Sequence, residues 1–252
     1  MLNLRKHNIL RGNSFIGNLL RIPFLIIPDN TVVFILTGIL KGKKWIIGSH
    51  NKSVWLGIYE RKQTKTFAEK CKGKNILWDL GAHSGYYTLL FKTVNKESTV
   101  YSFEPVDSNS RYFQKHMDLN NLGKINHSNN AVSDKEGVLK FAKGNSVGGK
   151  LCEEGDMEVS VVKLSALLER REIEIPDVIK MDIEGAEFEV LKDLKSLLSS
   201  NQKPIIFLST HSREVHDACI DLMNLMEYNI IPLDAKDVDN GREFLLEPVK
   251  RN

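Results

Sequence analysis

Short apolar runs alternate with helical segments along most of this chain, and this alternation limits the possible folds more than any other feature. The runs at 75–80, 99–103, 177–182 and 204–209 are each followed by a segment with helical periodicity. Strands that alternate with helices form a mostly parallel sheet with helices on both faces. The last runs, 228–233 and 243–248, have no crossover helix between them, which predicts an antiparallel hairpin at the sheet edge. We therefore expect an α/β fold.

The charge of the chain is unevenly distributed. Residues 1–75 contain 14 Lys or Arg and three acids, whereas residues 76–252 contain 21 Lys or Arg and 29 acids, for a net charge of +3. Two strand-like runs in 31–49 and a helix-like run at 58–71 lie in the basic part. We divide the chain into a small N-terminal basic β/α addition, 1–74, and a body, 75–252. The ordinary composition excludes disorder, collagen and coiled coil.

The cysteines and the N-terminus indicate a reduced, cytoplasmic protein. Cys71, Cys152 and Cys219 are odd in number and match no metal-binding spacing. The start of the sequence lacks the apolar core of a signal peptide, and charged residues and prolines interrupt the apolar stretch at 19–40. Membrane-surface contact through residues 4–27, which carry four Lys or Arg, is the less favoured alternative to packing on the body.

The turn after the first strand of the body predicts a binding site for a cationic cofactor. Ligands of open α/β sheets bind at the carboxyl ends of the strands. Two glycines four residues apart let the backbone approach a ligand there. An acid at this turn would repel a pyrophosphate, but it suits the ammonium and sulfonium of S-adenosylmethionine. The residues of this candidate site are Asp79, Gly81, Ala82, His83, Ser84 and Gly85.

Two further strand ends complete the expected cofactor site. Glu104 ends the 99–103 strand and can accept hydrogen bonds from both hydroxyls of a ribose. Asn129, Asn130 and Ala131 lie at the end of a strand expected at 125–132, where an amide side chain and a backbone N–H can contact an adenine edge. An ordinary polar turn is the alternative for this last segment.

Four motifs occur in a characteristic order along the chain: DLGAHSGYYTLL, YSFEP, NNAVSD and IKMDIEGAE. In this order they resemble the FkbM-type family of class I S-adenosylmethionine-dependent methyltransferases, and the resemblance extends from about residue 31 to about residue 230. The resemblance implies a seven-stranded Rossmann-like sheet and methyl transfer to a hydroxyl oxygen, typically of a sugar or natural product. It implies that Lys180, Asp182, Glu184 and Glu187 lie beside the transferred methyl group, with Asp182 also next to the cofactor. The family often has an acid two residues before a histidine after the fifth strand, but this chain has Ser209 before His211.

The candidate catalytic residues are Lys180, Asp182, Glu184 and His211. Asp182 and Glu184 are two residues apart, so an extended backbone places both on one side. They are suited to act as a base, to bind the substrate or to share a divalent cation. The sequence offers no obvious third oxygen ligand, so we assign no metal site. His211 is the other candidate base.

The expected acceptor is a sugar, a glycan or a glycosylated metabolite, including anionic and lipid-linked forms. Aromatic residues of the addition suit sugar faces and its lysines suit phosphate or carboxylate groups; these are Trp45, Trp55, Tyr59, Lys41, Lys43 and Lys44. The alternative is that the aromatic residues belong to the core and the lysines form a solvated face. We expect no nucleic-acid partner, because the body is acidic and no RNA-binding module is recognisable. Two alternatives to a methyltransferase remain: a nucleotide-dependent oxidoreductase and a non-catalytic binding protein with the same fold. The sequence does not indicate an oligomeric state.

Overall fold

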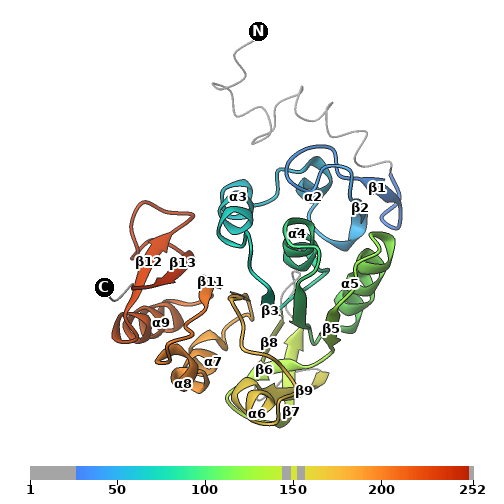
Figure 1. Cartoon of the computed structure of the whole chain (residues 1–252). Helices are drawn as coiled ribbons and strands as arrows, with labels where there is room; N and C mark the ends of the chain where they lie inside the picture. The colour runs from blue at the N-terminus through green and yellow to red at the C-terminus, as the bar shows by residue number, and fades with distance from the viewer. Residues whose placement is uncertain (1–26, 144–148, 152–156, 250–252) are drawn as a thin grey trace.

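The computed structural model describes residues 27–143, 149–151 and 157–249. Its centre is a seven-stranded sheet in the order β12-β13-β11-β10-β3-β4-β5 (Figure 1). The bounds are β3 Ile76–Leu80, β4 Thr99–Phe103, β5 Ile125–Ser128, β10 Val178–Met181, β11 Ile205–Ser209, β12 Tyr228–Pro232 and β13 Glu243–Pro248. The neighbours from β11 to β5 pair in parallel, whereas β13 is antiparallel to both β11 and β12. The predicted mostly parallel Rossmann-like sheet with a closing antiparallel hairpin is confirmed.

Helices cover both faces of this sheet, because its inner strands are buried on both sides. One face packs against α3 Arg61–Lys70, α4 Tyr86–Val94 and α5 Asp107–Leu119. The other face packs against α6 Leu164–Glu169, α7 Glu187–Asp193, α8 Lys195–Leu198 and α9 Arg213–Leu225. Alternate residues of β10 point to opposite faces, so Lys180 lies on the α4 side together with Asp79, its neighbour on β3. Both polar side chains therefore point to the face of the sheet that α3, α4 and α5 cover.

The described part of the N-terminal addition packs directly on the body. It contains a hairpin of β1 Val32–Phe34 and β2 Lys44–Ile46, then η1 Ile47–Ser49, α2 Ser53–Leu56 and α3. Ring stacking of Trp45 on His116, with centroids 3.7 Å apart, ties the hairpin to α5. His116 Nε2 accepts a hydrogen bond from the Ile46 N–H, so its Nδ1–H donates to the carbonyl oxygen of Ser84. One buried histidine therefore links the addition to the turn after β3.

A smaller four-stranded sheet lies beside the main one, in the order β6-β9-β7-β8. Its strands are β6 Ala131–Ser133, β7 Gly137–Lys143, β8 Gly149–Leu151 and β9 Met157–Lys163. The single strand predicted at 125–132 is therefore wrong: β5 ends at Ser128 and β6 begins a different sheet at Ala131. Local pattern could not show this, because both halves are extended and only their pairing partners differ.

The remaining expectations divide between described and undescribed residues. Cys71 and Cys219 are free and buried, whereas Cys152, residues 1–26 and most of the glycine-rich 144–150 segment lie outside the described residues. Within the described ranges, no helix combines the length and the apolar character needed to cross a bilayer.

Candidate functional site

The carboxyl ends of four adjacent parallel strands bring the predicted site residues to one edge of the sheet. Asp182 follows β10, Asp79 lies near the end of β3, Glu104 follows β4 and Asn130 follows β5. The chain runs outward from β3 to β5 and then returns to β10 on the other side of β3, so the strand order reverses between β3 and β10. Ligands of open α/β sheets bind at such a reversal.

Asp79 is a buried carboxylate behind the turn after β3. Its side chain is 2% exposed, and its Oδ2 accepts a hydrogen bond from the Thr88 hydroxyl at 2.5 Å. Burial raises the pKa of Asp79 to about 6, although the Thr88 hydrogen bond and the charge of Lys180 oppose the increase. The carboxylate is therefore ionised at neutral pH and held in a low-dielectric site.

The two glycines of this turn are required by close packing within the protein. Gly81 has φ +78°, and a Cβ there would lie 1.9 Å from the carbonyl oxygen of Asp182. Gly85 has φ +86°, and a Cβ there would lie 2.7 Å from Met117 and 2.8 Å from Phe113. Ligand approach at these glycines stays a prediction, and the structure adds that they bring the turn against the backbone after β10 and against α5.

Glu104 holds the same turn from the β4 side. It is 5% exposed, and its carboxylate accepts hydrogen bonds from the backbone N–H groups of His83 and Val106 and from the Asn109 side chain, at 2.8, 2.9 and 3.2 Å. Burial raises the pKa of Glu104, and these hydrogen bonds oppose the increase. Each carboxylate oxygen has two lone pairs, so Oε2, with one protein donor, retains acceptor capacity.

The segment predicted to contact adenine lies at the sheet border. The Asn130 side chain is half-buried and donates to the Ser128 hydroxyl at 2.8 Å. Ala131 is buried in β6, while Ser84 and Ala82 are buried within the turn after β3. His83 has φ +48°, and burial, followed by the nearby His50, lowers its pKa to about 4. The predicted cofactor residues therefore lie along three adjacent strand ends.

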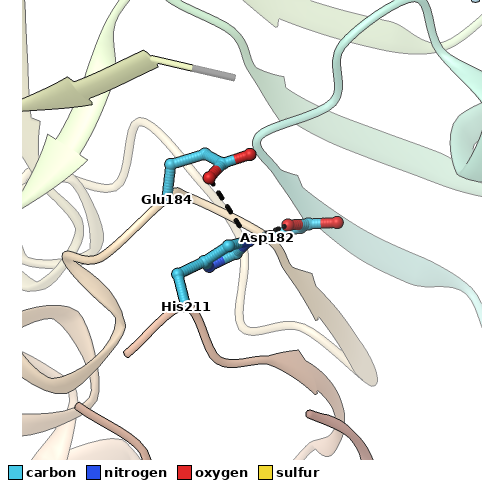
Figure 2. A group of neighbouring side chains, drawn as sticks. All are labelled: Asp182, Glu184 and His211. Carbon is cyan, nitrogen blue, oxygen red and sulfur yellow. Dashed lines mark ion pairs between the residues drawn. The ribbon is translucent and has the colours of Figure 1, made fainter. Parts of the chain in front are cut away.

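The predicted catalytic residues converge beyond β10 and β11. His211 Nε2 lies 3.2 Å from Asp182 Oδ1 and 3.4 Å from Glu184 Oε2 (Figure 2). Its Nδ1 lies 2.7 Å from Oε1 of Glu187, a residue at the start of α7 with no exposed surface. Burial alone would lower the pKa of His211, but the hydrogen bonds and charges of Asp182 and Glu187 raise it to about 10. In the protein without a bound cation, His211 is therefore positively charged at neutral pH.

Lys180 contacts the carboxylate oxygen of Asp182 that does not face His211. Its Nζ is buried, lies 3.4 Å from Asp182 Oδ2 and donates to the Ser209 hydroxyl at 2.7 Å. Burial would raise the pKa of Asp182, but Lys180 and His211 hold it well below its usual range. Lys180 is thus a fixed cation that orients the carboxylate of Asp182.

Glu243 supplies a carboxylate where the sequence lacks the acid expected at 209. Ser209 and Glu243 are paired residues of β11 and β13, and the Ser209 hydroxyl donates to Glu243 Oε2 at 2.8 Å. Burial raises the pKa of Glu243 to about 7, while Lys180 opposes the increase. Sequence reasoning missed Glu243, because the pairing of β13 with β11 is the only signal that brings it here.

The N-terminal addition contributes an aromatic wall next to these residues. Tyr59 packs edge-on against His50 and Tyr86, with ring centroids 4.7 and 4.9 Å away, and His50 packs against His83 at 4.6 Å. The pKa of Tyr59 is raised by burial and by Glu60, and the charge of Asp182 contributes. The addition therefore reaches both the turn after β3 and the cluster around His211.

Next to this wall is a pocket of about 150 Å³. Arg61 and Lys65 of α3 line it together with Tyr86 and apolar residues of the addition. Trp55 and Lys43 are half-buried, and Lys41 and Lys44 are exposed. The prediction that Trp45 contacts a sugar is wrong, because Trp45 is fully buried and stacks on His116.

The strand order and the acidic strand ends define a Rossmann-like fold of the class I methyltransferase type. The family described as the methyltransferase FkbM domain matches residues 79–230, and the chain belongs to this family. The matched region contains every residue predicted to bind the cofactor or to act in catalysis, whereas the residues predicted to contact the acceptor precede it. The proposed resemblance is therefore confirmed.

Two named methyltransferases are similar to this chain over about half of its length. Hexuronic acid methyltransferase AglP of Haloferax volcanii is 26% identical over 56% of this chain, and methyltransferase 1 of Beauveria bassiana is 26% identical over 51%. The matches cover 59% and 64% of these relatives, so the chain spans about three fifths of their length. The crystal structure of methyltransferase FkbM from Methylobacillus flagellatus superposes with a TM-score of 0.47 at 19% identity, over 69% of this chain and 43% of that one.

Proposed function

We propose that this protein transfers a methyl group from S-adenosylmethionine to a hydroxyl oxygen of a sugar-containing acceptor. The observation that carries the proposal is the arrangement of the strand ends. Asp79 and Glu104 lie on β3 and β4, and the cluster of Asp182, Glu184 and His211 lies across the reversal point on β10 and β11. This arrangement would hold a cofactor and an acceptor side by side along one edge of the sheet.

The described residues fit the cofactor chemically. Asp79 and Glu104 are acids at adjacent strand ends, which matches a ligand with an ammonium, a sulfonium and a ribose diol. The turn 81–85 contains no Lys or Arg for a phosphate. Helix α4 begins after Gly85 without a side-chain cap, and the Thr88 N–H already bonds to Asp79, so a bound carboxylate would use the N–H groups of the first two helical residues. These features favour S-adenosylmethionine over a pyrophosphate-containing nucleotide, and therefore a methyltransferase over an oxidoreductase.

The cluster on the other side would bind the acceptor. When bound, the cofactor supplies an electrophilic methyl group. The protein must then hold an oxygen about 3–3.5 Å from that carbon and help to remove its proton. Asp182 and Glu184 accept hydrogen bonds from acceptor hydroxyls, and their side chains are 37% and 42% exposed, so a substrate can reach them. Lys180 and Glu187 keep the reactive side chains in place.

The N-terminal addition would provide the acceptor side. Tyr59 and His50 form an aromatic surface beside the cluster, and Arg61 and Lys65 place positive charge in the neighbouring pocket. An acidic sugar fits this combination, and the similarity to the hexuronic acid methyltransferase of Haloferax volcanii supports the same class of acceptor. In this proposal residues 1–74 form the acceptor side and residues 75–252 form the cofactor side.

Transfer of tritium from methyl-labelled S-adenosylmethionine into candidate acceptors tests the proposal. We expect label in an alkali-stable ether of a uronic acid or uronic acid-containing glycan, and none with Asp182→Ala. Parallel extracts treated with ribonuclease separate a sugar acceptor from RNA. Tight binding of NAD with no binding of S-adenosylhomocysteine, measured calorimetrically, would contradict the proposal. Binding of S-adenosylhomocysteine without transfer to any fraction would favour a non-catalytic protein.

A further inference from the structure

Three ligand atoms of the catalytic cluster converge on one point. The carboxylates of Asp182 and Glu184 and the imidazole of His211 each contribute one atom, and the three atoms lie within 4.8 Å of one another (Figure 2). The sequence offered only the two carboxylates, which follow β10. The third group arrives from the end of β11, because β10 and β11 are parallel neighbours.

The hydrogen bonds around the cluster turn its acceptor atoms towards that point. Glu187 has no exposed surface and accepts from Nδ1 of His211, which directs Nε2 at the two carboxylates. Binding of a cation would displace the Nε2 proton, and the freed lone pair would ligate the ion. The Gly185 N–H donates to the same Oε1 of Glu187 and holds it in place. Lys180 contacts Oδ2 of Asp182, so Oδ1 is left for the centre of the cluster. A carboxylate behind a histidine is the usual outer support of a metal ligand.

We propose that Asp182, Glu184 and His211 bind one divalent metal ion. The ligand set is one oxygen from each of the two carboxylates and one imidazole nitrogen. With His211 neutral, the carboxylates of Asp182, Glu184 and Glu187 outnumber the neighbouring cation Lys180, so a divalent ion would balance the charge of the cluster. Partial exposure of all three side chains, between 28% and 42%, leaves coordination positions for water or for an acceptor hydroxyl. Carboxylates and water suit Mg²⁺ and Mn²⁺, and the single nitrogen donor favours Mn²⁺ between these two.

The ion would lie beside the cofactor turn, because Gly81 brings that turn against the Asp182 backbone. There it would act as a Lewis acid that binds the acceptor hydroxyl and lowers its pKa, and the second, uncoordinated oxygen of Glu184 would accept the proton. The oxygen–methyl bond would form as the sulfur–methyl bond breaks, with S-adenosylhomocysteine as the leaving group. This role depends on the proposed methyl transfer, whereas binding of the ion does not. In this role Asp182, Glu184 and His211 are ligands, and Glu187 is a positioning residue.

Titration of the chelator-treated full chain with Mn²⁺, without cofactor or acceptor, tests the site. We expect one saturable site by electron paramagnetic resonance of free Mn²⁺. Affinity should fall at least tenfold in Glu184→Gln, and also in Glu187→Gln through loss of the outer support. Glu214→Gln is the matched control: it removes the same charge from an exposed residue of α9, three positions after His211, and should bind as the wild type does.

Absence of saturable binding in the wild type, or equal affinity in all three variants, would overturn the proposal. S-adenosylhomocysteine affinity reports folding of each variant independently of the metal, so a misfolded variant is recognised and replaced by Asp182→Asn. If Mn²⁺ binds at one Glu184-dependent site but no methyl transfer occurs, the metal site stands and the proposed function fails. If transfer is unaffected by chelation, the ion has no role in the reaction.

Discussion

Replacement of Gly81 by alanine should disrupt the junction between the cofactor turn and β10. Gly81 has φ +78°, which costs a residue with a Cβ about 1–2 kcal/mol. The new Cβ would also lie 1.9 Å from the carbonyl oxygen of Asp182 and 2.8 Å from its carbonyl carbon. Both atoms belong to the backbone, so the clash can be relieved only if the turn or β10 moves. Overpacking of this kind typically costs about 1–3 kcal/mol, in addition to the cost of the backbone conformation.

Gly73→Ala provides the matched control. Gly73 has φ +72°, and a Cβ there would meet nothing within 4 Å. This variant therefore carries the same backbone cost without the clash, and alanine also restricts the unfolded chain, which offsets about 0.4–1 kcal/mol in both variants. We expect a loss of about 1 kcal/mol for Gly73→Ala and of about 2–4 kcal/mol for Gly81→Ala.

Urea unfolding followed by circular dichroism measures the free energy of unfolding of both variants, and calorimetry measures their affinity for S-adenosylhomocysteine. Gly81→Ala should weaken that affinity at least tenfold, because the turn and Asp182 shift together, whereas Gly73→Ala should leave it unchanged. Equal stability losses in the two variants, within about 0.5 kcal/mol, would show that the turn moves freely from β10 and would refute the packing argument.

Three further predictions concern buried ionisable groups. Burial raises the pKa of Asp79 to about 6, so affinity for S-adenosylhomocysteine should fall as the pH decreases through 6 and the carboxylate is protonated; calorimetry across pH 5–8 should show a much weaker dependence in Asp79→Asn. Glu104→Ala leaves the N–H groups of His83 and Val106 without their acceptor and should lower the free energy of unfolding by about 1–3 kcal/mol, as measured with urea; Glu104→Gln should lose less. Burial lowers the pKa of His127 to about 4, so its contribution to stability is complete above pH 6.5 and is lost as the pH falls towards 4. The unfolding free energy of His127→Gln should therefore depend on pH less steeply than that of the wild type, by up to about 1.4 kcal/mol per pH unit between these values. Identical slopes in the two proteins would contradict this prediction.

The cofactor side was largely predictable from the sequence. Strand ends in a parallel sheet lie at one edge, so Asp79, Glu104 and Asp182 could be placed together from local pattern and order. The reason for the glycines was not predictable, because a Cβ clash at Gly81 depends on a backbone atom about a hundred residues away. The role of Trp45 was predicted wrongly, since composition does not distinguish a sugar-stacking tryptophan from one buried against a histidine.

The sequence by itself determined the α/β fold, the parallel strands, the family and the set of acids at the strand ends, because these depend on periodicity and on short motifs. Only the tertiary structure decided which groups meet. The pairing of β10 with β11 brings His211 to Asp182 and Glu184, and the pairing of β13 with β11 places Glu243 behind Ser209. The packing of the addition on α4 and α5 places Tyr59 near them. Contacts between residues distant in sequence depend on strand order and packing, and neither can be inferred from a local sequence pattern.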